Sequence, residues 1–176
     1  MDIKPQDIIV LLKLVALGDR SLSINKLATE LGLSPSQVHA ALQRIVACRL
    51  AYKDSDTVRP NIANLREFLL HGLPYVLHVK HGALVRGMPT AHAAAPLNAQ
   101  IVDSEPPPVW PDADGEVRGL AFSPVHKSAP GAARRDSALY ELLSLVDAIR
   151  GGRAREKALA SKALKKRLDA YPTTHG

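Results

Sequence analysis

Apolar side chains fill most positions of residues 5–17, the first segment of the chain with a clear pattern. Pro5 suits the first turn of a helix, and Gly18 is placed to end one. Because the apolar positions surround the helix instead of forming one stripe, the pattern predicts a helix that lies in a hydrophobic core.

Two shorter helices are predicted next, with a glycine turn between them. Ser23 is a favourable N-cap for the first, whose apolar residues recur at helical spacing until Gly32. Ser34 caps the second, and Gln37 completes a capping box with it. Two helices joined by such a turn are typical of a helix-turn-helix. The buried side of the second helix is expected to comprise Val38, Ala41, Leu42 and Ile45.

The residues that follow predict a wing and a fourth helix. Residues 50–61 read as two short strands about a turn at residues 54–56. Asn61 is placed to cap a helix, and Gly72 and Pro74 are expected to end it.

Residues 73–130 carry no clear periodicity, because prolines and small residues interrupt every pattern. The turn signal Asp-Ala-Asp-Gly at 112–115 predicts a hairpin between residues 109–110 and residues 117–122. The topology of this region otherwise stays open.

Two helices are predicted near the C-terminus. Residues 137–150 are apolar along one side, which indicates an amphipathic helix packed on its own domain or on a second copy. After Gly151 and Gly152, a second helix carries a narrow apolar stripe with basic residues around the rest. The stripe comprises Ala160, Leu164 and Leu168.

These elements predict an α+β fold class that is mainly α, and they divide the chain into three parts. Residues 1–72 are expected to form a winged helix-turn-helix that binds DNA. Residues 73–136 form a small α+β region for ligand sensing or dimerisation. Residues 137–176 hold the amphipathic helix and the basic C-terminal helix.

The charge of the chain is compatible with a polyanionic partner without requiring one. The formal net charge is +6, and residues 137–176 carry 8 basic and 4 acidic side chains. This excess predicts contacts to phosphates or to a protein partner, although a solvated charged helix fits the same pattern. The candidates for such contacts are Arg153, Arg155, Lys162, Lys165, Lys166 and Arg167.

Other features argue against several functional classes. The single cysteine, Cys48, excludes a disulfide within the chain and favours a reducing cytoplasm. No apolar run reaches membrane-spanning length, so we expect a cytoplasmic protein without a membrane partner. His78 and His81 invite a metal site, but their spacing on a strand places them on opposite faces. Lys127 and Ser128 suggest a catalytic Ser/Lys pair, but the side chains of adjacent residues in an extended chain point apart. We expect no metal, no cofactor, no catalytic residue and no enzyme activity.

Polar side chains occupy the outward positions of the third helix. Glutamine can read adenine, and arginine can read guanine or bind a phosphate. The predicted DNA contacts of this helix are Ser36, Gln37, His39, Gln43 and Arg44. In the wing, Lys53 and Arg59 are placed to contact phosphates, although solvated turn residues explain them equally well. The alternative is a winged helix kept only as a protein-interaction module.

Residues 5–60 resemble the winged helix-turn-helix of bacterial transcriptional regulators of the MarR and related groups. The stretch INKLATELGLSPSQVHAALQRIVACRLA carries the resemblance. It implies a homodimer that binds an operator and often represses its own operon. The remainder does not resemble the MarR dimerisation helices. It is similar to small bacterial proteins that fuse a winged helix to a domain without assigned activity, including regulators and antitoxin-like proteins near toxin or defence genes.

We therefore expect a sequence-specific transcriptional regulator that binds double-stranded DNA as a dimeric (auto)repressor. The alternative is an antitoxin-like or adaptor protein that acts mainly through a protein encoded by a neighbouring gene.

Overall fold

The computed structural model describes residues 2–102 and 105–172, and its fold class is α+β with mainly helical content, as the sequence predicts. The helices of the N-terminal half are α1 (Pro5–Leu17), α2 (Ile24–Leu31), α3 (Pro35–Ala47), α4 (Ile62–Glu67) and α5 (Leu73–Val76). Those of the C-terminal half are α6 (Ala129–Arg135), α7 (Ser137–Gly151) and α8 (Ala154–Asp169). The strands are β1 (Ala51–Asp54), β2 (Thr57–Pro60), β3 (His81–Pro89), β4 (Pro108–Pro111) and β5 (Val117–Phe122). Short helical turns of other types are η1 (Phe68–Gly72), η2 (Ala91–Ala93) and η3 (Leu97–Ala99).

The three helices predicted for the N-terminal module are confirmed, and local signals explain where they begin and end. The Ser23 hydroxyl caps α2 by accepting a hydrogen bond from the backbone N–H of Lys26 (3.1 Å). Gly32 ends α2 with φ at 67°, a left-handed conformation that favours glycine. At the start of α3, Ser34 Oγ accepts from the backbone N–H of Gln37 (3.1 Å), and Gln37 Oε1 accepts from that of Ser34 (2.8 Å). These reciprocal bonds are the predicted capping box.

The wing is confirmed, whereas the predicted end of the fourth helix is wrong. Strands β1 and β2 pair antiparallel, and the Asn61 side chain caps α4 by accepting from the backbone N–H of Asn64 (3.2 Å). The helical path does not end at Gly72, because it continues through the π-helical turn η1 into α5, up to Val76. Pro74 is the second residue of α5, which follows the π-helical turn η1 directly.

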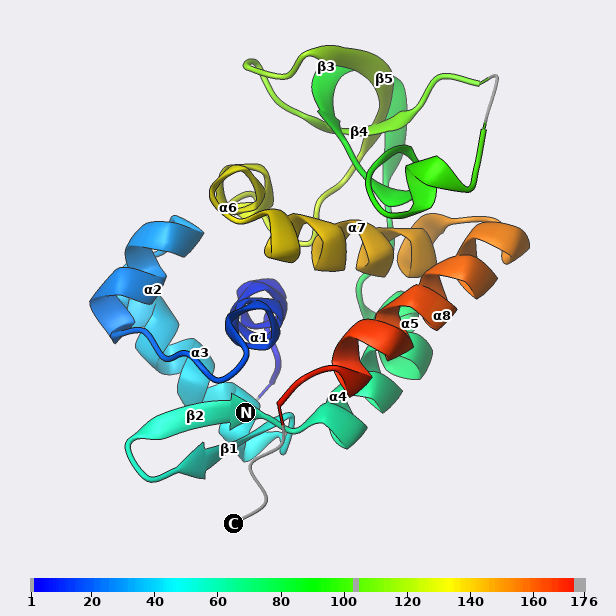
Figure 1. Cartoon of the computed structure of the whole chain (residues 1–176). Coiled ribbons are helices and arrows are strands. Elements are labelled where there is room, and N and C mark those ends of the chain that lie inside the picture. The colour runs from blue at the N-terminus through cyan, green and yellow to red at the C-terminus, as the bar shows by residue number, and fades with distance from the viewer. Residues whose placement is uncertain (1, 103–104, 173–176) are drawn as a thin grey trace.

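The strands β3, β4 and β5 form a small closed barrel, at the top of Figure 1. Strand β3 pairs antiparallel with both β4 and β5, which run parallel to each other. The predicted hairpin is therefore wrong. Its turn does form, since the backbone N–H of Gly115 bonds the carbonyl of Asp112 (3.0 Å), but β3 takes the antiparallel pairing. Gly87 permits this closure, because a Cβ there would collide with the carbonyl oxygen of Trp110.

Helix α7 lies at the centre of the fold, between the barrel and α1, as Figure 1 shows. The predicted amphipathic helix is confirmed, and it also buries Asp147, which is 0% exposed. The Asp147 carboxylate accepts hydrogen bonds from Thr90 Oγ1 and Trp110 Nε1, both at 2.7 Å. Its second oxygen pairs with Nη1 of Arg150 at 2.7 Å. This polar network fastens the barrel to α7.

Buried apolar residues of all three parts of the chain form one continuous core. Helix α8 contributes the predicted stripe, since Ala160, Leu164 and Leu168 are all buried against the core. Helix α8 packs beside α7 and α4. Among the described residues, no helix combines the length and apolar composition needed to cross a membrane.

Lys13 on α1 ties the helix-turn-helix to the C-terminal helices. Its side chain is 4% exposed, and its ammonium pairs with Glu30 of α2 at 2.7 Å and with Asp136 at 2.8 Å. Asp136 is the N-cap of α7, and Arg135 adds a hydrogen bond to the backbone carbonyl of Glu30 (3.1 Å). These contacts hold α1 and α2 in a fixed position on the body of the protein.

Candidate nucleic-acid interface

The outer face of α3, formed by Ser36, Gln37, His39 and Gln43, is exposed as predicted. Helix α3 carries no acidic residue. Gln37 is partly committed, because its Oε1 already accepts the Ser34 N–H in the capping box. The side chains of His39 and Gln43 make no hydrogen bond to another described residue, so their polar atoms are available to base edges.

The prediction that Arg44 points outward from α3 is wrong. Arg44 is 8% exposed and faces α1, where its Nε lies 2.8 Å from Oδ2 of Asp7 and its Nη2 lies 2.8 Å from Oδ1. Asp7 is fully buried, so an unpaired carboxylate there would be costly. Hydrogen bonding to Asp7 raises the pKa of Arg44. Arg44 therefore orients α3 on α1 and is not placed to touch DNA.

The two cations predicted for the wing differ in exposure and in the contacts that they already make. Lys53 is exposed on β1. Arg59 on β2 is half-buried, with Nε 2.9 Å from Oδ2 of Asp54 and Nη1 3.5 Å from the hydroxyl of Tyr171. The hydrogen bonds to Tyr171 and then to Asp54 raise the pKa of Arg59. Lys53 is free to reach a phosphate, whereas Arg59 is held against the end of α8.

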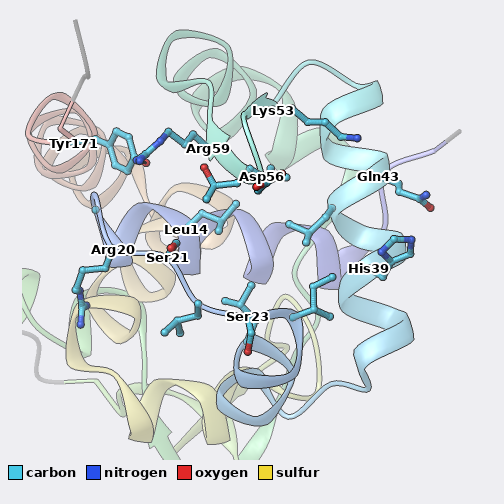
Figure 2. Close-up of a pocket in the computed structure, with 17 residues that line it drawn as sticks. Leu14, Arg20, Ser21, Ser23, His39, Gln43, Lys53, Asp56, Arg59 and Tyr171 are labelled. Carbon is cyan, nitrogen blue, oxygen red and sulfur yellow. The ribbon is translucent and has the colours of Figure 1, made fainter. Parts of the chain in front are cut away.

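A groove of about 530 Å³ lies between α3 and the wing and extends to the loop after α1. Figure 2 shows His39 and Gln43 on one side of it and Arg20, Arg59 and Tyr171 on the other. The lining also contains apolar side chains that form its floor. Its residues are Leu14, Gly18, Arg20, Ser21, Leu22, Ser23, Ile24, Leu27, His39, Leu42, Gln43, Lys53, Asp56, Thr57, Val58, Arg59 and Tyr171.

Residues 8–55 match the model of the IclR helix-turn-helix domain. The match runs from within α1 through α3 to the turn of the wing, and residues 1–7 and 56–176 lie outside it. It supports a DNA-binding helix-turn-helix of a transcriptional regulator and does not single out the MarR group. No curated protein and no solved structure matches the chain significantly.

The structure divides the basic residues of the C-terminal part into two groups. Arg150 is buried against Asp147, Arg153 pairs with Glu105 at 2.9 Å, and Arg167 pairs with Glu141 at 2.7 Å. The remaining cations of α8 are exposed, and their side chains form no ion pair with another residue that the structure describes. We call them the α8 cation row: Arg155, Lys157, Lys162, Lys165 and Lys166.

Sequence reasoning missed the residues that complete the groove. Arg20 follows α1 in a loop, and Tyr171 follows α8, so their proximity to the wing depends on the tertiary fold. No local signal marks either residue. In the part of the chain that the structure describes, no three His, Cys, Asp or Glu side chains gather into a metal site.

Proposed function

We propose that the protein is a sequence-specific transcriptional regulator that binds duplex DNA through the outer face of α3. One observation carries the proposal. The outer face of α3 is polar, exposed and without acidic residues, and α3 is the second helix of a motif that matches the IclR helix-turn-helix. DNA recognition needs hydrogen-bonding side chains that reach base edges without repelling phosphates.

In the proposed complex the N-terminal part of α3 enters the major groove, and α2 crosses the DNA backbone. Ser36, His39 and Gln43 contact base edges, and Lys53 contacts a phosphate beside the groove. Arg44 takes no part, because its guanidinium is occupied by Asp7.

The proposal includes dimerisation and repression, as expected from the sequence. Two copies related by two-fold symmetry would place their α3 helices about 34 Å apart on successive major grooves. A bound dimer would repress by occluding polymerase. Sedimentation of the protein with and without operator DNA measures the oligomeric state directly.

A mobility-shift assay with the DNA upstream of the protein's own gene tests the proposal. We expect retention of this duplex over a scrambled one, and Gln43→Ala or His39→Ala should weaken specific binding by about 1–3 kcal/mol each. Gln100→Ala, at an exposed glutamine outside α3, is the matched control and should bind normally. Equal binding to every duplex, no binding at all, or normal binding by both α3 variants would overturn the proposal.

The α8 cation row favours a second candidate function, in which an acidic protein docks on α8. The five side chains of this row have no ion-pair partner among the described residues, so they expose positive charge on α8. Such a surface attracts an acidic partner. Co-purification with the product of a neighbouring gene tests this candidate. Alanine substitution of Lys162, Lys165 and Lys166 should abolish the co-purification, and an unchanged yield of partner would reject it.

A further inference from the structure

The groove between α3 and the wing has the properties of a small-molecule site. We propose that it binds an organic anion with an apolar chain, a medium-chain carboxylate, and that this ligand excludes DNA from the outer face of α3. The second half of the proposal rests on the proposed function, whereas the first half does not.

The floor of the groove is apolar and open to solvent. Leu14 and Leu27 are buried beneath it, and four further apolar side chains are only half-buried. These four are Leu22, Ile24, Leu42 and Val58. Ligand pockets have volumes of roughly 300–1,000 Å³ and combine apolar walls with a few polar groups. The groove, at about 530 Å³, lies within that range.

The rim of the groove selects a negative charge. Arg20, Lys53 and Arg59 line it, and Asp56 is the one carboxylate among the described lining residues. A second carboxylate, Asp54, lies just outside the lining and pairs with Arg59. Asp54 and the Tyr171 hydroxyl already orient Arg59 through its Nε and Nη1, so little side-chain entropy is lost when the remaining Nη2 donates to a carboxylate. Asp54 offsets the charge of Arg59, so the net positive charge of the rim comes from Arg20 and Lys53. A carboxylate with an alkyl chain fits this arrangement, because the chain can pack on the apolar floor while the carboxylate lies at the basic rim.

The same groove overlaps the proposed DNA contacts. His39, Gln43, Lys53 and Arg59, which the sequence predicts as DNA-binding residues, all line it. A ligand in the groove would cover the side of α3 that faces the wing, and its carboxylate would offset the charge of Lys53, the wing cation that we propose contacts a phosphate. Ligand and DNA should therefore bind in competition.

Isothermal titration calorimetry on the full chain, without DNA, tests the site. Sodium decanoate should bind, and decyltrimethylammonium, which has the same chain and the opposite charge, should bind at least about tenfold more weakly. Leu42→Gln and Arg59→Gln should each weaken decanoate binding by about tenfold. Lys80→Met, which removes an exposed cation outside the groove, should leave binding unchanged.

Circular dichroism checks the fold of each variant, and Arg59→Gln keeps the test valid if Leu42→Gln does not fold. Absence of decanoate binding, equal binding of the cationic analogue, or normal binding by Arg59→Gln would overturn the site.

A fluorescence-anisotropy titration with labelled operator duplex tests the competition. Decanoate should release the duplex from the unmodified protein, and Leu42→Gln should hold its duplex at the same decanoate concentration. If decanoate binds in calorimetry and the duplex stays bound at saturation, the competition is wrong. If no duplex binds in the absence of ligand, the proposed function fails while the calorimetric result for the site stands.

Discussion

Asp7 on α1 and Arg44 on α3 form a buried bidentate ion pair, with both nitrogen–oxygen distances at 2.8 Å. The fork of a guanidinium matches the two oxygens of a carboxylate, which fixes the angle between the partners as well as their distance. The pair therefore sets the orientation of α3 on the core helix α1, and with it the orientation of the outer face that we propose reads DNA.

Removal of Arg44 should destabilise the protein strongly. Arg44→Ala leaves the buried Asp7 carboxylate unpaired, and breaking such a pair costs about 3–5 kcal/mol. Urea unfolding followed by circular dichroism measures the loss. The neighbouring Gln43→Ala is the control, and at an exposed position it should change stability by no more than about 0.5 kcal/mol. Equal stability of the two variants would show that Arg44 is not a structural partner of Asp7.

Asp136 should make stability depend on pH in the acid range. Burial alone raises the pKa of Asp136, but hydrogen bonds from Lys13 and from the backbone N–H of Leu139 outweigh burial and lower it. Because the folded-state pKa lies below the unfolded value of about 3.9, this stabilisation is fully present above that pH. It is lost as the pH falls through the folded-state pKa.

The variant Asp136→Asn tests this dependence. It should lose roughly 1.5–3 kcal/mol at neutral pH, because Lys13 then lacks one of its charged partners, and its stability should fall less steeply in acid. Urea unfolding at a series of pH values from about 6 to about 2 measures both effects. Asp19→Asn, at an exposed site in the loop after α1, is the matched control. Parallel acid profiles for Asp136→Asn and the unmodified protein would contradict the prediction.

The α8 cation row can contribute to DNA binding through phosphate contacts. The salt dependence of the binding constant measures whether such contacts are made. Each lost phosphate contact reduces the slope of log K against log salt by about 0.9. Alanine at Lys162, Lys165 and Lys166 should lower that slope. Arg167→Ala should not, because Arg167 is already paired with Glu141. An unchanged slope for the triple variant would leave α8 outside the DNA interface.

The helix-turn-helix could be predicted from the sequence because its signals are local. Caps such as Ser23 and Ser34, the turn at Gly32 and the apolar stripe of α3 act within a few residues of one another. The sequence pattern assigns Arg44 to the outer face of α3, because Arg44 lies beside the buried stripe and helical periodicity alone places that position toward solvent. Its burial depends on a partner in α1, 37 residues earlier, that no helical pattern reveals.

The strand pairing of the barrel could not be predicted either, because it too depends on residues far apart in the sequence. The turn at residues 112–115 is a strong local hairpin signal and does form. The pairing of β4 and β5 is nevertheless decided by β3, whose paired residues lie 20 or more positions earlier in the chain. Helix α6 was missed as well, because seven residues rich in alanine carry little periodicity. For the candidate site, the exposed face of α3 was predictable, whereas the groove was not, since Arg20 and Tyr171 meet the wing only in the folded chain.

The continuous core predicts that the barrel and the helix-turn-helix unfold together. Trp110 is the only tryptophan and lies fully buried in β4, so its fluorescence reports on the barrel, while far-ultraviolet circular dichroism reports mainly on the helices. Coincident urea transitions by both probes are expected, because α7 packs against α1 and is bonded to Trp110 through Asp147.

Leu12→Ala provides the decisive variant, because Leu12 is fully buried in α1 and lies in a different element from Trp110. The cavity should cost about 2–5 kcal/mol, and the fluorescence midpoint should fall together with the circular-dichroism midpoint. Tyr52→Ala, at an exposed residue of the wing, serves as the control and should move neither midpoint appreciably. A fluorescence transition that stays in place while the dichroism transition moves would mean that the barrel folds independently of α1.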